Sequence, residues 1–185
     1  MRHKAGERVD YVVTYLEMEA RPAYPRPHLP TGAPSALIAA ERPPLWWFLT
    51  LYDTVGAAYE WTDQRALPLA EVEAFLADPD VGLYTLMRAG WPHGFFVLDG
   101  RVRGVTDLVY VGLVPQVIGQ GLGRFLIQTA VHMAWDRPGT ARVTVNTNSL
   151  DHPRALPLYQ KAGFAPVRRE TRTRVLTRDR NTIGD

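Results

Sequence analysis

The chain has 185 residues, 46% of them hydrophobic and 22% charged, which suits a single folded domain and excludes an intrinsically disordered chain. A formal net charge of +2 is too small to indicate a nucleic-acid partner, and the lack of cysteine excludes disulfides, thiolate metal sites and a cysteine nucleophile. No apolar stretch reaches the roughly 18 residues of a membrane span, and the basic N-terminus lacks the apolar core of a signal peptide, so we expect a cytoplasmic protein without a membrane partner.

The N-terminal part of the chain predicts one strand, one irregular segment and two helices. Residues 9–18 favour a strand, whereas residues 20–36 hold five prolines and predict an irregular surface segment. A helix begins after Pro44, and its apolar residues occupy nearly all of its sides. A second helix runs from about residue 68 to residue 77.

The remainder of the chain alternates between strands and helices. Its periodicity predicts strands at 82–88, 94–99, 105–114 and 142–147, helices at about 121–135 and 153–162, and an extended stretch at 164–176. The order β-α-α-β-β-β-α-β-α-β, without repeats or linkers, predicts one α/β domain over residues 1–185.

Three glycines at alternate positions, Gly119, Gly121 and Gly123, lie between an apolar strand and a helix. A turn of this kind presents free backbone N–H groups at the positive end of a helix dipole and suits a phosphate or pyrophosphate. A dinucleotide fingerprint would need a glycine at Arg124, and a P-loop would need Gly-Lys-Ser/Thr, so both motifs are excluded. A tight turn without a ligand is the alternative interpretation.

A second motif lies in the helix expected at 153–162. It reads Ala-x-x-Leu-Tyr-x-x-x-Gly-Phe, with Ala155, Leu158, Tyr159, Gly163 and Phe164 in register. The two motifs together resemble those of the GNAT superfamily of acyl-CoA-dependent N-acyltransferases, whose pyrophosphate-binding turn reads Arg/Gln-x-x-Gly-x-Gly/Ala. Gly121 and Gly123 match that turn, whereas Ile118 stands where the family has Arg or Gln.

Two longer stretches resemble one bacterial subgroup of the superfamily. They read Gly-Leu-x-Pro-x-x-Ile-Gly-x-Gly-Leu-Gly and Asp-His-Pro-x-Ala-Leu-x-x-Tyr. The resemblance implies the GNAT fold, a mixed, mostly antiparallel sheet flanked by helices. It also implies acetyl-CoA as co-substrate, without a metal, and direct attack of an amine on the thioester. The residues that it places at CoA are Leu113, Val114, Gly119, Gln120, Gly121, Leu122, Gly123, Arg124 and Tyr159.

The expected chemistry needs a base for the incoming ammonium and an acid for the departing thiolate. Asp107 and the valines at 105, 109 and 111 occupy every second position of the predicted strand, so we expect their side chains to share one face. The carboxylate of Asp107 would then lie on an apolar face, where burial raises its pKa. It is the candidate base, directly or through a water, because many members of the family carry Glu at this place. A structural role, such as capping a turn, is the alternative.

Two residues of the second motif are further candidates. Tyr159 matches the tyrosine that the family places at the CoA sulfur, so the resemblance implies that it protonates the thiolate. A core tyrosine is the alternative. Asp151 or His152 caps the helix, or contacts the acceptor or cofactor. A metal site is not expected, because none of the histidines shows the i, i+4 ligand spacing.

An aromatic cluster and an arginine-rich tail complete the set. The cluster, with Trp46, Trp47, Tyr52 and Trp61 as the acceptor-binding candidates, forms the core, an acceptor pocket or a homodimer interface. We expect the acceptor pocket to come from residues 20–60 and the end of the chain. The arginines between residues 168 and 180 predict a solvated face rather than a nucleic-acid site.

Acetyl transfer to a primary amine of a small molecule is therefore the leading functional hypothesis. Acetylation of a protein N-terminus or lysine is an alternative within the same family. A non-catalytic acyl-CoA-binding module is an alternative from another class, because Ile118 and Asp107 depart from the commonest family pattern.

Overall fold

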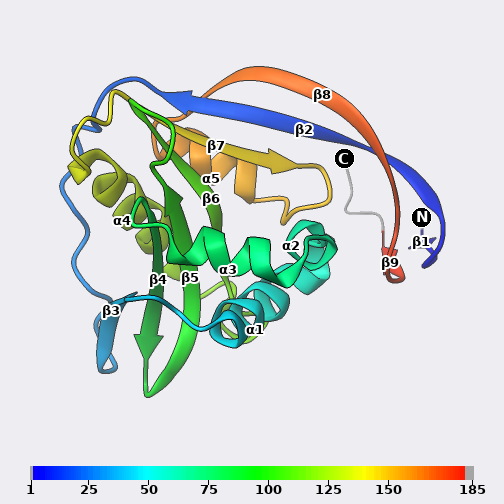
Figure 1. Cartoon of the computed structure of the whole chain (residues 1–185), viewed down its shortest axis with the longest axis horizontal. Helices are drawn as coiled ribbons and strands as arrows, with labels where there is room; N and C mark the ends of the chain where they lie inside the picture. Colours follow the sequence, from blue (N-terminus) through cyan, green and yellow to red (C-terminus); the bar gives the residue numbers. More distant parts are fainter. Residues whose placement is uncertain (1, 182–185) are drawn as a thin grey trace.

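The computed structural model describes residues 2–181 of the chain. Its main sheet has seven strands in the order β3-β4-β5-β6-β7-β2-β8, and β1 pairs with β9 in a separate small sheet (Figure 1). Among the neighbours in the main sheet, only β6 and β7 run parallel. The strands are β1 Arg2–His3, β2 Arg8–Met18, β3 Ser35–Ala40, β4 Val81–Arg88, β5 Trp91–Asp99, β6 Val105–Leu113, β7 Arg142–Asn148, β8 Ala165–Val175 and β9 Arg180–Asn181.

Helices cover both faces of this sheet. The longer helices are α1 Leu45–Gly56, α3 Leu69–Ala77, α4 Leu122–Asp136 and α5 Ala155–Lys161. The short elements are η1 Ala57–Tyr59, α2 Asp63–Ala66 and η2 Pro115–Val117. Helices α1 and α3 pack on one face, where Phe48 and Val72 meet Phe95. Helices α4 and α5 pack on the other face, where Leu126 and Tyr159 belong to the same buried cluster as Phe96.

The central strand β5 shows why the sheet needs helices on both sides. Phe95 and Phe96 point to opposite faces of the sheet and are both fully buried. A strand that is apolar on both faces is stable only when both faces are covered, because each exposed side would leave large apolar groups in water. The predicted α/β domain with a mixed, mostly antiparallel sheet flanked by helices is confirmed.

Every predicted strand and helix has a counterpart in the structure, with ends shifted by a few residues. The largest difference lies in the N-terminal part of the chain, where β3 begins inside the segment expected to be irregular. Once the prolines end at Pro34, Ser35–Ala40 pairs with β4 at the edge of the sheet. The short elements β1, η1, α2, η2 and β9 are also absent from the prediction, because each is too brief to show a period.

One irregularity in β6 changes which side chains share a face. The pairing of β5 with β6 shifts between Val97 and Leu98, so that Val97 lies opposite Tyr110 and Leu98 opposite Leu108. The extra residue, Val109, forms a β-bulge, so the side chains beyond it alternate in the opposite sense to those before it.

Within residues 2–181, no helix has both the length and the apolar character needed to cross a bilayer.

Candidate active site

The sheet divides between β6 and β7, and this division opens a cleft. The two strands pair only from Val105 to Asp107, opposite Arg142 to Thr144. Beyond that point a cavity of about 590 Å³ is lined by residues 109–113 of β6 and by Asn146 and Asn148 of β7. Because the facing edges of the two strands no longer pair with each other there, backbone N–H and C=O groups of β6 are available to an extended ligand.

One end of the cleft is the glycine turn that leads into α4. Gly119 and Gly121 have φ values of +90° and +80°, the left-handed backbone region that favours glycine. Gly121 is the N-cap of α4, and no side chain in the described part of the chain caps this helix. The N–H groups of its first turn therefore remain free to bind an anionic group of a ligand.

The residues expected at CoA divide into two sets. Those that line the cleft are Leu113, Gly119, Gly121, Gly123, Arg124 and Tyr159. Val114 and Leu122 are instead buried in the hydrophobic cluster beneath α1, and Gln120 is exposed on the outside of the turn. These three side chains therefore shape and border the turn, while the glycine backbone and the side chains of Leu113, Arg124 and Tyr159 line the cavity.

Asp107 lies at the point where β6 and β7 separate, and it is not one of the residues that line the cavity. Its carboxylate accepts a hydrogen bond from Thr144 Oγ1 at 2.5 Å. Burial raises the pKa of Asp107, the hydrogen bond from Thr144 opposes this, and the charge of Asp99 adds to it. The raised pKa is the one expected for a base.

The expectation that Asp107 shares a face with Val111 is wrong. Asp107 pairs with Asp99, and Val111 pairs with Phe96, whose side chain is on the opposite face from that of Asp99. The bulge at Val109 is the physical reason, because one extra residue reverses the alternation that the sequence pattern assumes.

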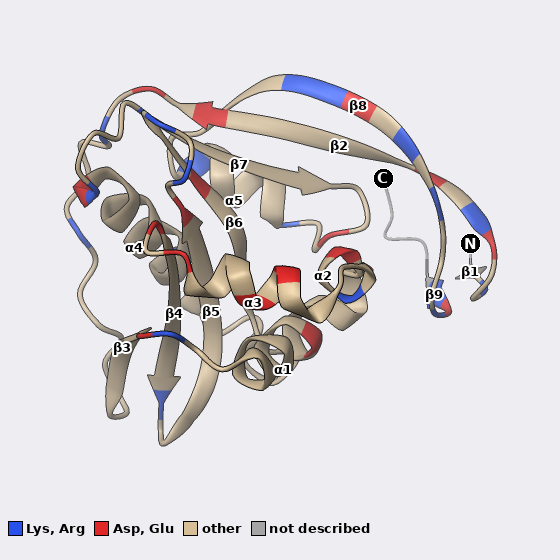
Figure 2. Cartoon of the chain, viewed as in Figure 1, with Lys and Arg blue, Asp and Glu red and all other residues tan. Residues whose placement is uncertain are grey.

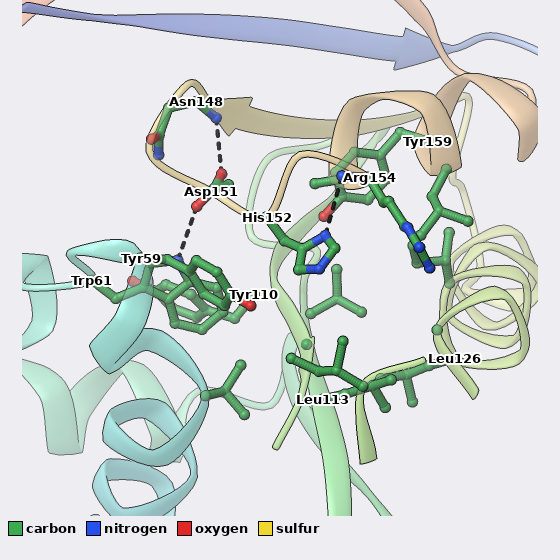
Figure 3. A pocket seen from close by; sticks show the side chains of 18 of the residues that line it. Tyr59, Trp61, Tyr110, Leu113, Leu126, Asn148, Asp151, His152, Arg154 and Tyr159 are labelled. Atoms are coloured by element: carbon green, nitrogen blue, oxygen red, sulfur yellow. Dashed lines mark hydrogen bonds between the residues drawn. The ribbon is translucent and has the colours of Figure 1, made fainter. Parts of the chain in front are cut away.

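Tyr159 projects from α5 towards the cleft (Figure 3). The residue is 6% exposed, and its ring packs edge-on against Phe164 with the centroids 6.0 Å apart. Burial raises the pKa of Tyr159 above its usual value, and the charges of Asp151 and Asp107 raise it further. The phenol is thus both a core side chain and a neutral hydroxyl at the cavity, so the two interpretations of this residue are compatible.

The other end of the cleft has an aromatic wall made by Tyr59, Trp61 and Tyr110 (Figure 3). The rings of Trp61 and Tyr110 lie 5.3 Å apart between centroids, at an interplanar angle of 47°. Aromatic faces suit an apolar or cationic ligand, because the ring faces carry partial negative charge. This wall belongs to η1, the loop to α2, and β6.

The four aromatic residues expected at the acceptor do not lie together. Only Trp61 lines the cleft; Trp46 is 66% exposed on the outer side of α1, and Trp47 packs against the hydrophobic cluster beneath that helix. Tyr52 is fully buried. The reason is geometric: α1 presents its inner side to the sheet, so only Val55 in its last turn and the segment beyond its C-terminal end reach the cleft.

Tyr52 nevertheless contributes to the site through Asp63, which lines the cleft. The Tyr52 hydroxyl donates to Asp63 Oδ1 at 2.6 Å, and the Tyr110 hydroxyl donates to Asp63 Oδ2. Burial raises the pKa of both phenols, followed by the effects of Asp63 itself. Two neutral phenols therefore hold one carboxylate at the aromatic end of the cleft.

The loop between β7 and α5 closes the same end with Asp151 and His152. Asp151 caps the loop, because its Oδ2 accepts hydrogen bonds from Thr147 Oγ1 at 2.7 Å and from the N–H of Asn148 at 2.8 Å. His152 Nδ1 accepts the N–H of Arg154 at 3.1 Å. The prediction that one of them caps the helix is wrong, because the N-cap of α5 is Arg154 and no side chain of the described residues caps it. Both Asp151 and His152 line the cleft.

A two-stranded ribbon reaches over this end of the molecule (Figure 1). Residues 8–12 of β2 pair only with β8, since β7 begins to pair at Val13. Arg172 of β8 lines the cleft, and Arg174 donates to Thr62 Oγ1 at 2.6 Å. Figure 2 shows the basic residues along β8, and at least one of them is directed to the site rather than to solvent alone.

Four residues that the sequence did not indicate also line the cleft, namely Asp63, Asn146, Asn148 and Arg172, whereas the segment 20–40 does not contribute to the lining. Asp63 was not predicted because it follows the last residue of the aromatic cluster. Arg172 was not predicted because it is one arginine among several in a basic run. For Arg172, the available signal in the sequence was the alternation of side chains between the two faces of β8.

Within residues 2–181, no group of three or more His, Cys, Asp or Glu side chains could hold a metal ion.

The family of the chain follows from comparison with known proteins. The model of the acetyltransferase (GNAT) family matches residues 16–164, so the chain belongs to this family. No curated protein matches the sequence.

Solved structures show the same fold at low sequence identity. A GCN5-related N-acetyltransferase from Kribbella flavida is 21% identical with a TM-score of 0.59, over 88% of this chain and 56% of that one. Another from Sphaerobacter thermophilus is 15% identical with a TM-score of 0.63, over 94% of this chain and 52% of that one. This chain thus spans about half the length of those two proteins.

A shorter similar structure is an aminoglycoside acetyltransferase from an uncultured soil metagenomic sample, solved in complex with sisomicin. It is 15% identical with a TM-score of 0.55, over 70% of this chain and 87% of that chain.

Proposed function

We propose that the protein transfers an acetyl group from acetyl-CoA to a primary amine of a small molecule. The observation that carries this proposal is one continuous cavity that runs from the glycine turn of α4, through the divided sheet, to the aromatic wall. A cavity of this form lets an anionic, extended donor enter from one side and an amine from the other.

The glycine-turn end fits the phosphates of CoA. The free N–H groups of the first turn of α4 and the guanidinium of Arg124 offer donors and positive charge to a pyrophosphate. A smaller hollow beside this turn is lined by Arg124, Gln128 and Lys161 and would suit a further phosphate. The unpaired edge of β6 would then hold the amide groups of the pantetheine arm.

The proposed reaction is direct attack of the amine on the thioester carbonyl. A C–N bond forms and the C–S bond breaks, while the nitrogen loses a proton and the sulfur gains one. Asp107 takes the proton from the nitrogen through a water, since its carboxylate lies outside the cavity lining. The Tyr159 hydroxyl, which lines the cavity, gives a proton to the leaving sulfur.

The aromatic end supports a small acceptor over a protein. It is bordered by Tyr59, Asp63 and His152 and is covered by the ribbon that carries Arg172. A cavity of about 590 Å³ is in the range of small-molecule sites and is shared with the donor arm. An acetylated protein segment would need the ribbon to open.

Acetyl-CoA turnover with a panel of small primary amines tests this proposal, with release of free thiol as the readout. We expect thiol release that depends on the amine, together with the acetylated amine in mass spectra. A lysine-bearing peptide and a peptide with a free N-terminus serve as the comparison. Tight CoA binding without turnover of any amine or peptide would instead identify a non-catalytic acyl-CoA-binding module.

A further inference from the structure

His152 projects into the cleft from the loop before α5, between the aromatic wall and the side chains of α5 (Figure 3). Its Nδ1 lies 3.1 Å from the backbone nitrogen of Arg154. A backbone nitrogen always carries its hydrogen, so Nδ1 must be the acceptor and holds no proton. The ring can therefore carry its proton only on Nε2.

The neutral form of this ring is favoured at neutral pH. Burial lowers the pKa of His152, and the charge of Arg154 lowers it further. A second proton would have to enter at Nδ1 and would break the hydrogen bond from Arg154. His152 is thus held as a donor at Nε2, and it has no free lone pair with which to act as a base.

The ring is also fixed in direction. The imidazole ring packs against the Tyr59 ring in a T-shaped arrangement, with the ring centroids 6.3 Å apart and an interplanar angle of 75°. The preceding residue, Asp151, is anchored by the backbone N–H of Asn148 and by Trp61 Nε1. Tyr59 and Trp61 form the aromatic wall, so the imidazole belongs to the acceptor end of the cleft rather than to the glycine turn.

We propose that His152 donates a hydrogen bond from Nε2 to an oxygen of the acceptor, so that the preferred substrate is a primary amine that also carries a hydroxyl, ether or carbonyl oxygen. This inference rests on the proposed function, because it assigns a substrate class to the same site. A polar donor fixed in an aromatic-walled cavity selects for an acceptor atom, since a ligand without one displaces water from the half-buried N–H and offers no hydrogen bond in its place.

Two substitutions separate the donor from the loop cap. His152→Asn keeps an acceptor atom near the position of Nδ1, so the hydrogen bond from Arg154 can persist, but it removes the Nε2–H group. His152→Gln places an amide N–H near the position of Nε2. His28→Asn makes the same chemical change at an exposed histidine that does not line the cleft.

The test compares primary amines in pairs that differ by one oxygen, such as 2-amino-1-phenylethanol with 2-phenylethylamine and ethanolamine with ethylamine. We expect the wild-type protein and His28→Asn to prefer the oxygen-bearing member of a pair by roughly 10-fold in kcat/KM, the effect of one good hydrogen bond. His152→Asn should remove this preference, and His152→Gln should restore part of it. Equal unfolding temperatures for the wild type and His152→Asn would show that the loop is intact.

Three results would overturn the inference, and the first two concern the preference within the pairs. One is amine acetylation by the wild type without any preference in these pairs; the other is a preference that survives His152→Asn. The third is an equal loss of kcat/KM for both members of each pair in His152→Asn, together with a raised KM for acetyl-CoA. That result would assign His152 to the acyl group instead of the acceptor. Failure of the proposed function looks different, since no amine would be acetylated by any of the four proteins.

Discussion

Trp61 Nε1 donates a hydrogen bond to Asp151 Oδ1 at 3.3 Å and joins two segments that lie 90 positions apart in the chain. The aromatic wall and the loop of His152 therefore hold each other in place across the cleft. Each partner also has contacts of its own: Asp151 is anchored by its loop, and the Trp61 ring packs against Tyr52, Phe95 and Tyr110. The hydrogen bond links these two supported groups at the aromatic end of the cleft.

Trp61→Phe should weaken acceptor binding while leaving the cofactor end unaffected. The substitution keeps an aromatic ring but removes the N–H donor, which leaves the buried Asp151 carboxyl without this partner and costs about 1–3 kcal/mol. We expect the KM of the amine to rise roughly 10-fold or more, because 1.4 kcal/mol corresponds to a factor of ten. The KM of acetyl-CoA should stay unchanged in steady-state kinetics.

Trp46→Phe is the matched control, because it makes the same change at a tryptophan that is 66% exposed and outside the cleft. If Trp46→Phe raises the amine KM as much as Trp61→Phe does, the assignment of the acceptor end to the Trp61 side is contradicted. Sedimentation of Trp46→Ala and the wild type at the same concentration shows separately whether this exposed ring is part of a homodimer interface.

Gly121→Val should abolish CoA binding in a folded protein. A Cβ at Gly121 meets no atom within 4 Å, so the substitution causes no clash within the chain. Its φ of +80° is unfavourable for a β-branched residue by about 1–2 kcal/mol, and the turn is expected to change shape. The N–H groups of α4 would then no longer converge on a phosphate. Calorimetric titration with CoA measures the loss.

Gly139→Val introduces the same strain elsewhere. Gly139 has a φ of +79°, also has open space around it, and lies in the turn after α4, outside the cleft. We expect a similar decrease in unfolding temperature for both variants but normal CoA affinity for Gly139→Val. Wild-type CoA affinity in Gly121→Val would show that the cofactor binds elsewhere.

The helices and strands could be predicted because their signals are local. Pro44 before α1 and the apolar period of α4 appear in the sequence itself, and so does the alternation that defines β2. The glycine turn could be predicted for the same reason, since Gly119 and Gly121 need the left-handed backbone that they have.

The aromatic end of the cleft could not be predicted, because it is assembled from contacts between distant segments. Asp63 enters the site through two phenols that come from α1 and β6, and no sequence pattern links these positions. The bulge at Val109 is set by packing on both faces of β5 and leaves no motif. The pattern of an all-round apolar helix indicated Trp46 and Trp47, but tertiary packing placed them away from the cleft.

Asp107→Asn should lower turnover at neutral pH while leaving CoA binding intact. A positioned base contributes about 10²–10⁴-fold, and the amide cannot take a proton. The loss should shrink at high pH, where the amine is already deprotonated. A pH–rate profile with the wild-type shape would contradict the role, and Asp53→Asn, at an exposed carboxylate paired with Arg65, is the control.

The same variant should change how stability depends on pH. Because burial raises the folded-state pKa of Asp107 above 3.8, the folded state binds its proton more tightly than the unfolded state does. This carboxyl therefore contributes a stability that falls as pH rises from about 3.8 through the raised pKa. Asn carries no such charge, so the unfolding temperature of Asp107→Asn relative to the wild type should increase from pH 4 to pH 7. A constant difference would show that Asp107 does not titrate with a raised pKa.

Tyr159→Phe should lower kcat with little change in the affinity for CoA, because it removes only the hydroxyl and keeps the ring that packs against Phe164. A thiolate leaves moderately well without help, so we expect a loss of roughly 10–100-fold, towards the weak end of general-acid effects. Burial raises the pKa of Tyr159, so the phenol stays protonated and the ratio of wild-type to variant kcat should be constant from pH 6 to pH 9. Tyr24→Phe is the control, since its hydroxyl bonds the carbonyl of Ala162 away from the cleft. Equal kcat for Tyr159→Phe and the wild type, measured in single turnover so that chemistry is observed, would leave Tyr159 as a packing residue.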